Sequence, residues 1–122
     1  MRKRFSNGEI RNTLRLPGYD YSSSGAYSVT MCTRPRRPIF DRPELRAILE
    51  ETWRAVPGRH KGTQLDMFVI MPDHLHFIIW LDQEISGGTT LGEIIGAYKS
   101  LTAVEWIRYV RANGLNERAK FW

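Results

Sequence analysis

Two apolar segments separated by Pro72 and Asp73 constrain the fold of this chain more than any other feature. Residues 65–71 are rich in branched and aromatic side chains, and residues 74–81 read His-Leu-His-Phe-Ile-Ile-Trp-Leu. Two strands joined by a tight turn are the simplest interpretation. Because side chains alternate between the two faces of a strand, the second strand has one wholly apolar face, formed by Leu75, Phe77, Ile79 and Leu81. We expect that face to pack against helices.

The chain before the hairpin contains a third strand and an irregular basic segment. Residues 26–32 alternate between apolar and polar side chains, which is typical of a half-buried strand. Residues 34–38 contain two prolines and three arginines. Since proline cannot donate to a strand ladder, we expect this segment to be a loop.

Two amphipathic helices are predicted, one on each side of the hairpin. The first has a capping signal at Asp41, an apolar stripe at helical spacing, and a stop at the proline-glycine pair 57–58. The second begins at Thr90, which forms a capping box with Glu93, and ends at the asparagine-glycine pair 113–114. Its expected apolar stripe consists of Leu91, Ile94, Ile95, Tyr98, Leu101, Val104 and Ile107.

These elements follow the order β-α-β-β-α, and residues 121–122 lie where another strand would begin. A β-α-β-β-α-β series is typical of an α+β, ferredoxin-like fold, with a mainly antiparallel sheet and both helices on one face. We interpret residues 1–122 as a single domain whose last strand is cut off. Within it, residues 1–24 form a basic N-terminal arm and residues 25–122 form a core that is incomplete at its C-terminal end.

The composition suits a globular domain in a reducing compartment. The chain has 122 residues, of which 42% are hydrophobic and 25% are charged, so it can bury a core. The single cysteine, Cys32, cannot form an internal disulfide. Neither a secretory signal nor an apolar run of the roughly 18 residues needed to cross a membrane is present. We therefore expect a cytoplasmic protein with no membrane partner.

The positive charge is concentrated near the N-terminus. The chain carries a net charge of +5, and residues 1–40 hold eight basic side chains against two acidic ones. Arginine grips phosphate groups through two parallel hydrogen bonds, so these residues are candidates for DNA contact. The alternative is a solvated segment that only increases solubility. The candidate DNA-binding residues are Arg2, Lys3, Arg4, Arg11, Arg15, Arg34, Arg36 and Arg37.

His74 and His76 are candidate metal ligands. As residues i and i+2 of one strand they lie on the same face, where two imidazoles can converge on a divalent cation. The alternative is a pair of polar residues satisfied by solvent and backbone. No third histidine follows at Ile78, which argues against the His-x-His-x-His nucleotide hydrolases. Oxygen ligands would have to complete the shell, which favours Mg²⁺ or Mn²⁺ over structural Zn²⁺.

Residues 71–79, which include this histidine pair, resemble the His-hydrophobic-His segment of the single-tyrosine HUH transposases, in particular the REP-associated tyrosine transposases. Further similar segments are found at residues 14–21, 25–27, 30–33 and 91–102. The resemblance extends over nearly all of residues 11–122. It implies a ferredoxin-like fold and a metal-dependent activity that cuts and joins single-stranded or hairpin DNA. It also implies a prokaryotic, nucleoid-associated protein, for which a homodimer is a candidate assembly.

The resemblance also implies roles for individual residues. His74 and His76 would hold the Mg²⁺ or Mn²⁺ that polarises the scissile phosphate, and a tyrosine hydroxyl would attack it. The products would be a 5′ phosphotyrosine and a free 3′ hydroxyl. In the family this tyrosine lies on a helix after the last strand, so we expect it beyond Trp122 and expect this chain to be inactive alone. Among the internal tyrosines, we expect Tyr98 in the core and Tyr109 on an exposed helix surface.

Two other functions remain open from the sequence. One is a non-catalytic module that binds DNA hairpins, and the other is a small metal-dependent phosphodiesterase. Three further residues each have two interpretations. Asp73 is a turn residue or a negative charge beside the metal, and Lys99 is a solvated helix residue or a phosphate contact. Trp80 is a platform for stacking bases or is covered by a further segment.

Overall fold

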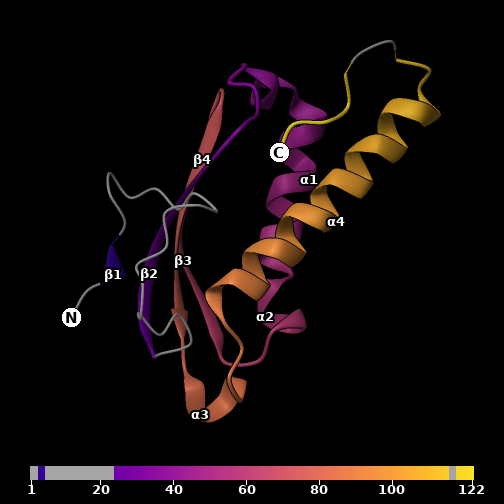
Figure 1. Ribbon diagram of the computed structural model, residues 1–122. Helices are drawn as coiled ribbons and strands as arrows, with labels where there is room; N and C mark the ends of the chain where they lie inside the picture. The colour runs from indigo at the N-terminus through magenta and orange to yellow at the C-terminus, as the bar shows by residue number, and fades with distance from the viewer. Residues whose placement is uncertain (1–2, 5–23, 116–117) are drawn as a thin grey trace.

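The computed structural model describes residues 3–4, 24–115 and 118–122, with the backbone alone described for residues 3–4. Its strands are β1 (Lys3–Arg4), β2 (Gly25–Cys32), β3 (Thr63–Met71) and β4 (His74–Leu81). Its helices are the 3-10 helix η2 (Ile39–Asp41), α1 (Pro43–Arg54), α2 (Val56–Arg59), α3 (Gln83–Ser86) and α4 (Leu91–Ala112). The predicted succession of three long strands and two long helices is confirmed (Figure 1).

The strands form one sheet in the order β1-β2-β4-β3. Strands β2 and β3 both pair antiparallel with β4, which therefore lies in the middle of the three long strands. Strands β3 and β4 form the predicted hairpin, with Pro72 and Asp73 at its turn. A register shift between Leu65 and Phe68 marks a bulge in β3. The two-residue strand β1, which the sequence did not predict, pairs parallel with β2 at the sheet edge.

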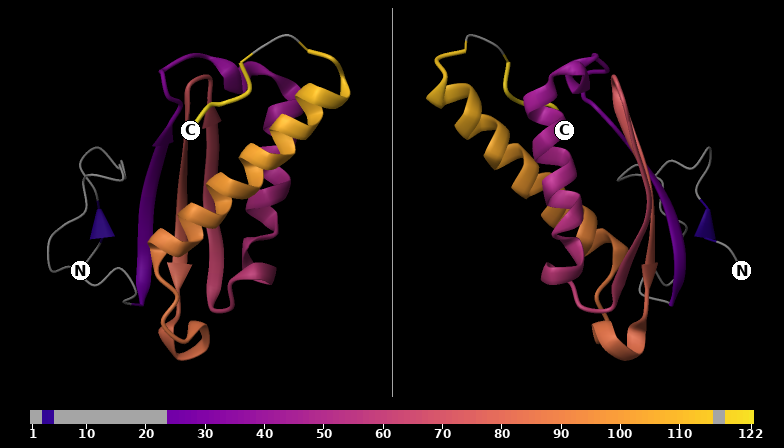
Figure 2. Two further views of the ribbon diagram at one scale, coloured as in Figure 1. Left: turned by 45° about the vertical axis from the view of Figure 1, so that its right-hand side comes forward. Right: turned by 180° about the vertical axis from the view of Figure 1, so that it is seen from behind.

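Both long helices cover the same face of this sheet (Figure 2). The predicted apolar face of β4 lies beneath them, because Leu75, Phe77, Ile79 and Leu81 are at most 3% exposed. The alternating apolar residues of β2 are buried in the same core. The α+β, ferredoxin-like arrangement is therefore confirmed, and the opposite face of the sheet carries no helix among the described residues.

The apolar stripe of α4 follows the expectation only over its first half. Leu91, Ile94, Ile95 and Tyr98 are buried as predicted. Beyond Tyr98 the buried positions recur every four residues, at Thr102, Trp106 and Val110. Val104 is 45% exposed, so its predicted place in the core was wrong. None of the described helices is long and apolar enough to span a membrane.

The ends of α1 were also predicted incorrectly. Arg42, not Asp41, is the N-terminal capping residue, and no side chain caps the helix. The residue before a proline is held extended and Pro43 suits the first helical position, so the boundary falls between them. At the other end, α1 ends at Arg54, and Pro57 is the second residue of the short helix α2. Proline is tolerated there because an N–H in the first turn has no helical acceptor.

The capping prediction for α4 is confirmed at both ends. The hydroxyl of Thr90 accepts a hydrogen bond from the backbone N–H of Glu93 at 3.1 Å. At the other end Gly114 adopts a φ of +60°, a left-handed conformation that glycine allows without strain. The chain can therefore turn back toward the sheet after α4.

Residues 118–122 form no strand, so the strand expected to begin at residues 121–122 is not observed there. They are nevertheless fixed beside the end of β2. The N–H of Arg34 donates to the carbonyl of Phe121 at 2.9 Å. Phe121 and Trp122 both make edge-on ring contacts with Phe40. The terminal segment thus lies against the loop that follows β2, on the helix side of the sheet.

Candidate functional site

His74 and His76 lie side by side on the face of the sheet that the helices of the described residues leave uncovered. We call this surface the histidine face. Each histidine faces one residue on β2 and one on β3: His74 pairs with Cys32 and Met71, and His76 pairs with Thr30 and Val69. By the same register Ser28, Ile78 and Trp80 lie on this face, with Ala26 and Gln64 on either side of Trp80.

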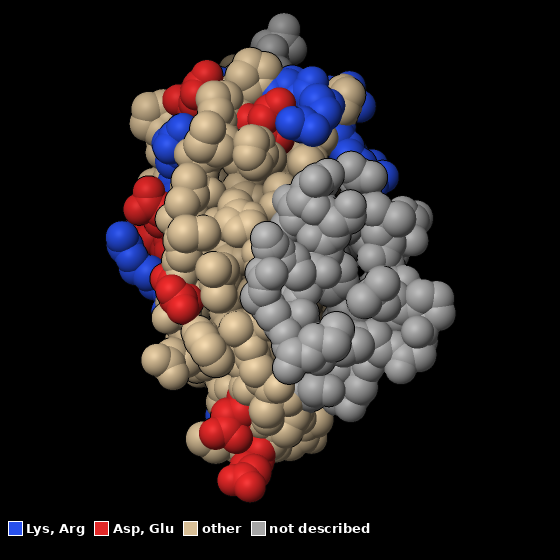
Figure 3. Space-filling model, turned by 90° about the vertical axis from the view of Figure 1, so that its left-hand side faces the viewer, with Lys and Arg blue, Asp and Glu red and all other residues tan. Residues whose placement is uncertain are grey.

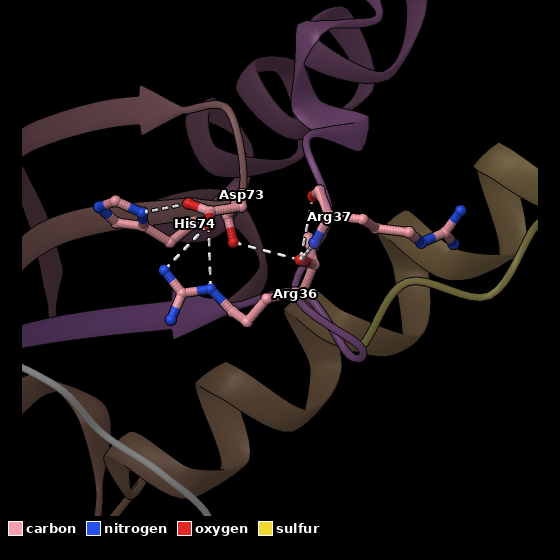
Figure 4. A network of polar contacts seen from close by, with 5 residues as sticks. Arg36, Arg37, Asp73 and His74 are labelled. Atoms are coloured by element: carbon pink, nitrogen blue, oxygen red, sulfur yellow. Dashed lines mark hydrogen bonds and ion pairs between the residues drawn. The ribbon is translucent and has the colours of Figure 1, made fainter.

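The imidazole of His74 is oriented by a carboxylate. Its Nδ1 lies 2.9 Å from Oδ1 of Asp73, while Oδ2 of Asp73 accepts from the Arg36 guanidinium at 3.0 and 3.1 Å (Figure 4). The hydrogen bond from His74 lowers the pKa of Asp73, desolvation opposes this shift, and Arg36 lowers the pKa further. Asp73 is therefore charged near neutral pH and accepts the Nδ1–H of His74. The lone pair of His74 is then on Nε2, which has no partner among the described residues.

His76 is held by two hydroxyl groups of the neighbouring strand. Its Nδ1 lies 2.7 Å from Oγ1 of Thr30, and its Nε2 lies 3.2 Å from Oγ of Ser28. A hydroxyl can donate or accept, so either ring nitrogen can carry the proton. The contact with Ser28 is the longer of the two. The shorter contact, with Thr30, holds the ring through Nδ1.

These residues suit a partial metal site. An imidazole whose second nitrogen binds a carboxylate is the usual arrangement of a histidine ligand, and His74 with Asp73 matches it. Among the residues that the structure describes, however, no group of three or more histidine, cysteine or acidic side chains could surround an ion. Two imidazoles from β4 would leave the other positions to oxygen atoms from water or a ligand. Such a shell is compatible with Mn²⁺ or Mg²⁺.

Beyond the histidines the same face is apolar and exposed. Val69, Met71 and Trp80 are 41%, 43% and 45% exposed, and the indole N–H of Trp80 donates to Asp66 at 2.9 Å. Figure 3 views the molecule from this side, and uncharged atoms fill the centre of the described surface. Charged groups lie toward its margins. A tryptophan fixed on an apolar surface can stack on a nucleic acid base.

The three arginines of the loop after β2 take different positions. Arg36 points toward Asp73 and His74, on the histidine face, whereas Arg37 points away from them (Figure 4). The Arg37 guanidinium donates to the backbone carbonyls of Arg118 and Lys120. Arg34 lines a pocket with Lys99 on the helix side. Only Arg36 of these three therefore adjoins the histidine pair.

The other predicted DNA contacts fall in the N-terminal arm. Arg2, Arg11 and Arg15 lie outside the described residues. Lys3 and Arg4 form β1, which pairs with Tyr27 and Ser28 of β2, but their side chains are not described.

The tyrosines that the structure describes all lie on the helix side of the sheet, away from the histidines. Tyr27 is fully buried beneath the helices. Tyr98 is buried as expected, and its hydroxyl donates to the carbonyl of Leu49 at 2.8 Å. Burial, and then the charge of Glu50, raise the pKa of Tyr98 well above its usual range. Tyr109 was expected to be exposed but is half-buried and stacks on Trp106, with 5.4 Å between ring centroids.

Tyr19 and Tyr21 are outside the described residues. The expected position of the nucleophile beyond Trp122 remains a prediction.

The sequence indicated the histidine pair but not the groups that hold it. Ser28 and Thr30 contact His76 across 48 and 46 residues of chain, so only the pairing of β2 with β4 reveals them. The sequence did contain one indication of these partners, because Ser28 and Thr30 are polar residues on the same face of the alternating strand β2. Asp73 lies in the turn, as one of its two interpretations held, and its carboxylate binds His74. Its other interpretation, a negative charge beside a metal ion, stays a prediction.

Comparison with known proteins gives two kinds of match. No model of a protein family matches the chain. An uncharacterised protein of Haemophilus influenzae is 30% identical over an alignment of 89 residues, and the match covers 66% of this chain and 49% of that protein. The chain thus spans about half the length of this relative. Because the relative is uncharacterised, the match indicates no activity for this chain.

Solved structures give the second kind of match. A protein of Deinococcus radiodurans assigned as a transposase has a TM-score of 0.55 at 19% identity, over 80% of this chain and 68% of its own. A REP-associated tyrosine transposase bound to a REP hairpin has a TM-score of 0.56 at 19% identity, over 88% of this chain and 59% of its own. The chain therefore has the fold of these transposases, as its sequence resemblance implied.

Proposed function

We propose that this chain is the HUH-type domain of a transposase, which binds single-stranded or hairpin DNA on the histidine face. The observation that carries this proposal is the histidine pair on a surface that none of the described helices covers, with His74 oriented by Asp73. The adjacent exposed Trp80 supports it, because stacking on bases is independent of DNA sequence. The fold shared with a transposase that was solved with a REP hairpin is consistent with the same ligand class.

The proposed metal site consists of His74 and His76, with Mg²⁺ or Mn²⁺ as the ion. When bound, this ion would act as a Lewis acid on a phosphate group of the DNA. Asp73 holds the imidazole of His74 in the tautomer that presents Nε2, and Arg36 keeps Asp73 charged and in place. Thr30 holds the ring of His76 through Nδ1. The chain's own contribution is therefore to fix two imidazoles on one surface.

A titration with Mn²⁺ tests the metal site directly. Mn²⁺ broadens the NMR signals of nearby nuclei, and the three histidines of this chain give few ring signals to assign. We expect the rings of His74 and His76 to broaden at the lowest Mn²⁺ concentrations. His60, which follows α2, serves as the internal control and should broaden only later. Equal broadening of all three rings, or earlier broadening of His60, would show that the pair is not a metal site.

A non-catalytic DNA-binding module is the second candidate function. It is favoured by the absence of a third protein ligand among the described residues and by the two hydroxyl partners of His76. Affinity for a DNA hairpin, measured with Mn²⁺ and then with EDTA, separates the two candidates. A module that needs no metal should bind equally in both conditions. Tighter binding with Mn²⁺ that is lost in the His74→Ala variant would favour the metal-dependent domain.

A further inference from the structure

A second basic site lies on the helix side of the sheet. It is an open pocket of about 380 Å³ between α4, the loop after β2 and the terminal segment. We call it the basic pocket, and its lining residues are Arg34, Pro35, Lys99, Arg118, Lys120 and Trp122. Four of these six side chains are cationic and none is acidic. Pockets of this size hold small ligands, and the charge of this one favours an anion.

The walls of the basic pocket are held in place by contacts of the terminal segment. The Arg37 guanidinium binds the carbonyls of Arg118 and Lys120. The indole N–H of Trp122 donates to Oγ1 of Thr102 on α4 at 2.9 Å. These contacts fix the backbone around the cationic residues before any ligand arrives. A pocket with fixed walls loses less entropy on binding than a disordered basic tail would.

The cations of the pocket have no acidic partners in the described part of the chain. Elsewhere the pattern differs, since Arg36, Arg54 and Arg108 each form an ion pair with an acidic side chain. Lys99 lies half-buried with Nζ 6.0 Å from the centre of the Trp122 ring. Burial, and then the charge of Arg34, lower the pKa of Lys99. A bound anion would favour the charged form of Lys99 and so oppose both causes of the lowered pKa.

We propose that the basic pocket binds a phosphate group of a DNA strand, at a point separate from the histidine face. This inference rests on the proposed DNA-binding function and adds a second contact to it. The histidine face and the basic pocket meet at the loop after β2, where Arg36 points toward His74 and Arg37 binds the terminal segment (Figure 4). A strand that leaves the histidine face past Arg36 would pass around the end of β2 into the pocket. There Lys99 and Arg34 would bind its phosphate.

The test compares three variants that each remove one positive charge. Lys99→Gln and Arg34→Gln alter the pocket, and Arg108→Gln is the matched control. Arg108 is an exposed residue of α4 that pairs with Glu105. Fluorescence anisotropy with a labelled single-stranded oligonucleotide gives the affinity at several salt concentrations. We expect each pocket variant to bind more weakly and to lower the slope of log K against log salt by about 0.7 per lost phosphate contact. The control should leave the slope unchanged.

The contrary result is a salt slope that changes no more in the pocket variants than in Arg108→Gln, while the unaltered protein still binds DNA. It would show that the basic pocket binds no DNA phosphate, and it would leave the proposed function intact. Circular dichroism of each variant checks that the fold is retained. If the unaltered protein binds no DNA, the proposed function fails as well.

Inorganic phosphate is the second probe, and it distinguishes a DNA phosphate from a free one. Its addition should shift the indole NMR signal of Trp122 in the unaltered protein but not in Lys99→Gln. The buried indole of Trp53 serves as the reference. If phosphate shifts Trp122 and the DNA slopes also fall as expected, the pocket takes a phosphate of the strand. If phosphate shifts Trp122 but the slopes do not change, the pocket takes a free phosphate, and its assignment to DNA is wrong.

Discussion

Replacement of Tyr98 by phenylalanine tests whether this residue joins the two helices of the core. The side chain is 3% exposed, and its hydroxyl donates to the Leu49 carbonyl of α1 at 2.8 Å. Leu49 lies within α1, so its carbonyl also accepts a helical hydrogen bond and keeps a partner in the variant. The loss should therefore be close to the net value of a single hydrogen bond, about 1 kcal/mol.

Urea unfolding measures this loss. For a domain of this size the dependence of unfolding free energy on urea is about 1–3 kcal/mol per molar, so the midpoint should fall by about 0.3–1 M. Tyr109→Phe is the matched control, since Tyr109 lies on the same helix and its hydroxyl forms no hydrogen bond within the described structure. Its midpoint should change little. DNA affinity should be the same in both variants.

An unchanged midpoint in Tyr98→Phe together with lost DNA binding would refute this reasoning. It would mean that the hydroxyl of Tyr98 acts on the ligand and does not stabilise the core.

Three further predictions follow from the described contacts. Asp73→Asn should weaken Mn²⁺ binding by about 10- to 100-fold, because the amide is a poorer acceptor for the Nδ1–H of His74, and a calorimetric titration measures this. The pKa of Asp73 is lowered from its usual value of 3.8, so the negative charge of this residue stabilises the fold at pH values above 3.8. This stability should be lost as the pH falls through the lowered pKa, and acid unfolding should show no such loss in Asp73→Asn. Thr90→Ala should lower the unfolding free energy by about 1 kcal/mol in urea, because the N–H of Glu93 loses its cap.

The sequence predicted correctly those features of the fold that depend on residues close together in the chain. The alternation over residues 74–81 predicted both the bounds and the buried face of β4, since the period of a strand decides which side chains lie together. The capping box at Thr90 succeeded for a similar reason, because its partner lies three residues away. The start of α1 was missed although its signal was local. Asp41 is a better cap than Arg42 by residue type, but the backbone limits imposed by Pro43 decided the boundary.

Features formed by distant residues could not be predicted in the same way. The sequence predicted a hydrophobic stripe through Val104, whereas Trp106 and Val110 are the buried apolar residues in the second half of α4, which packs on α1. The basic pocket depends on Arg37, which binds carbonyl groups 81 and 83 residues further along the chain. Nothing in the spacing of the basic residues indicated that Arg34 would line the pocket with Lys99. The histidine pair was identified because both residues lie on one strand.

The central claim is that DNA binds the histidine face of the sheet. NMR mapping with a DNA hairpin tests it most directly, because the indole of Trp80 and the rings of His74 and His76 report on this face. Val104, which is 45% exposed on α4, reports on the opposite side. If DNA binds there, the hairpin should shift the signals of Trp80 and the two histidines, with no change at Val104. Shifts confined to α4, with Trp80 and both histidines unaffected, would contradict it.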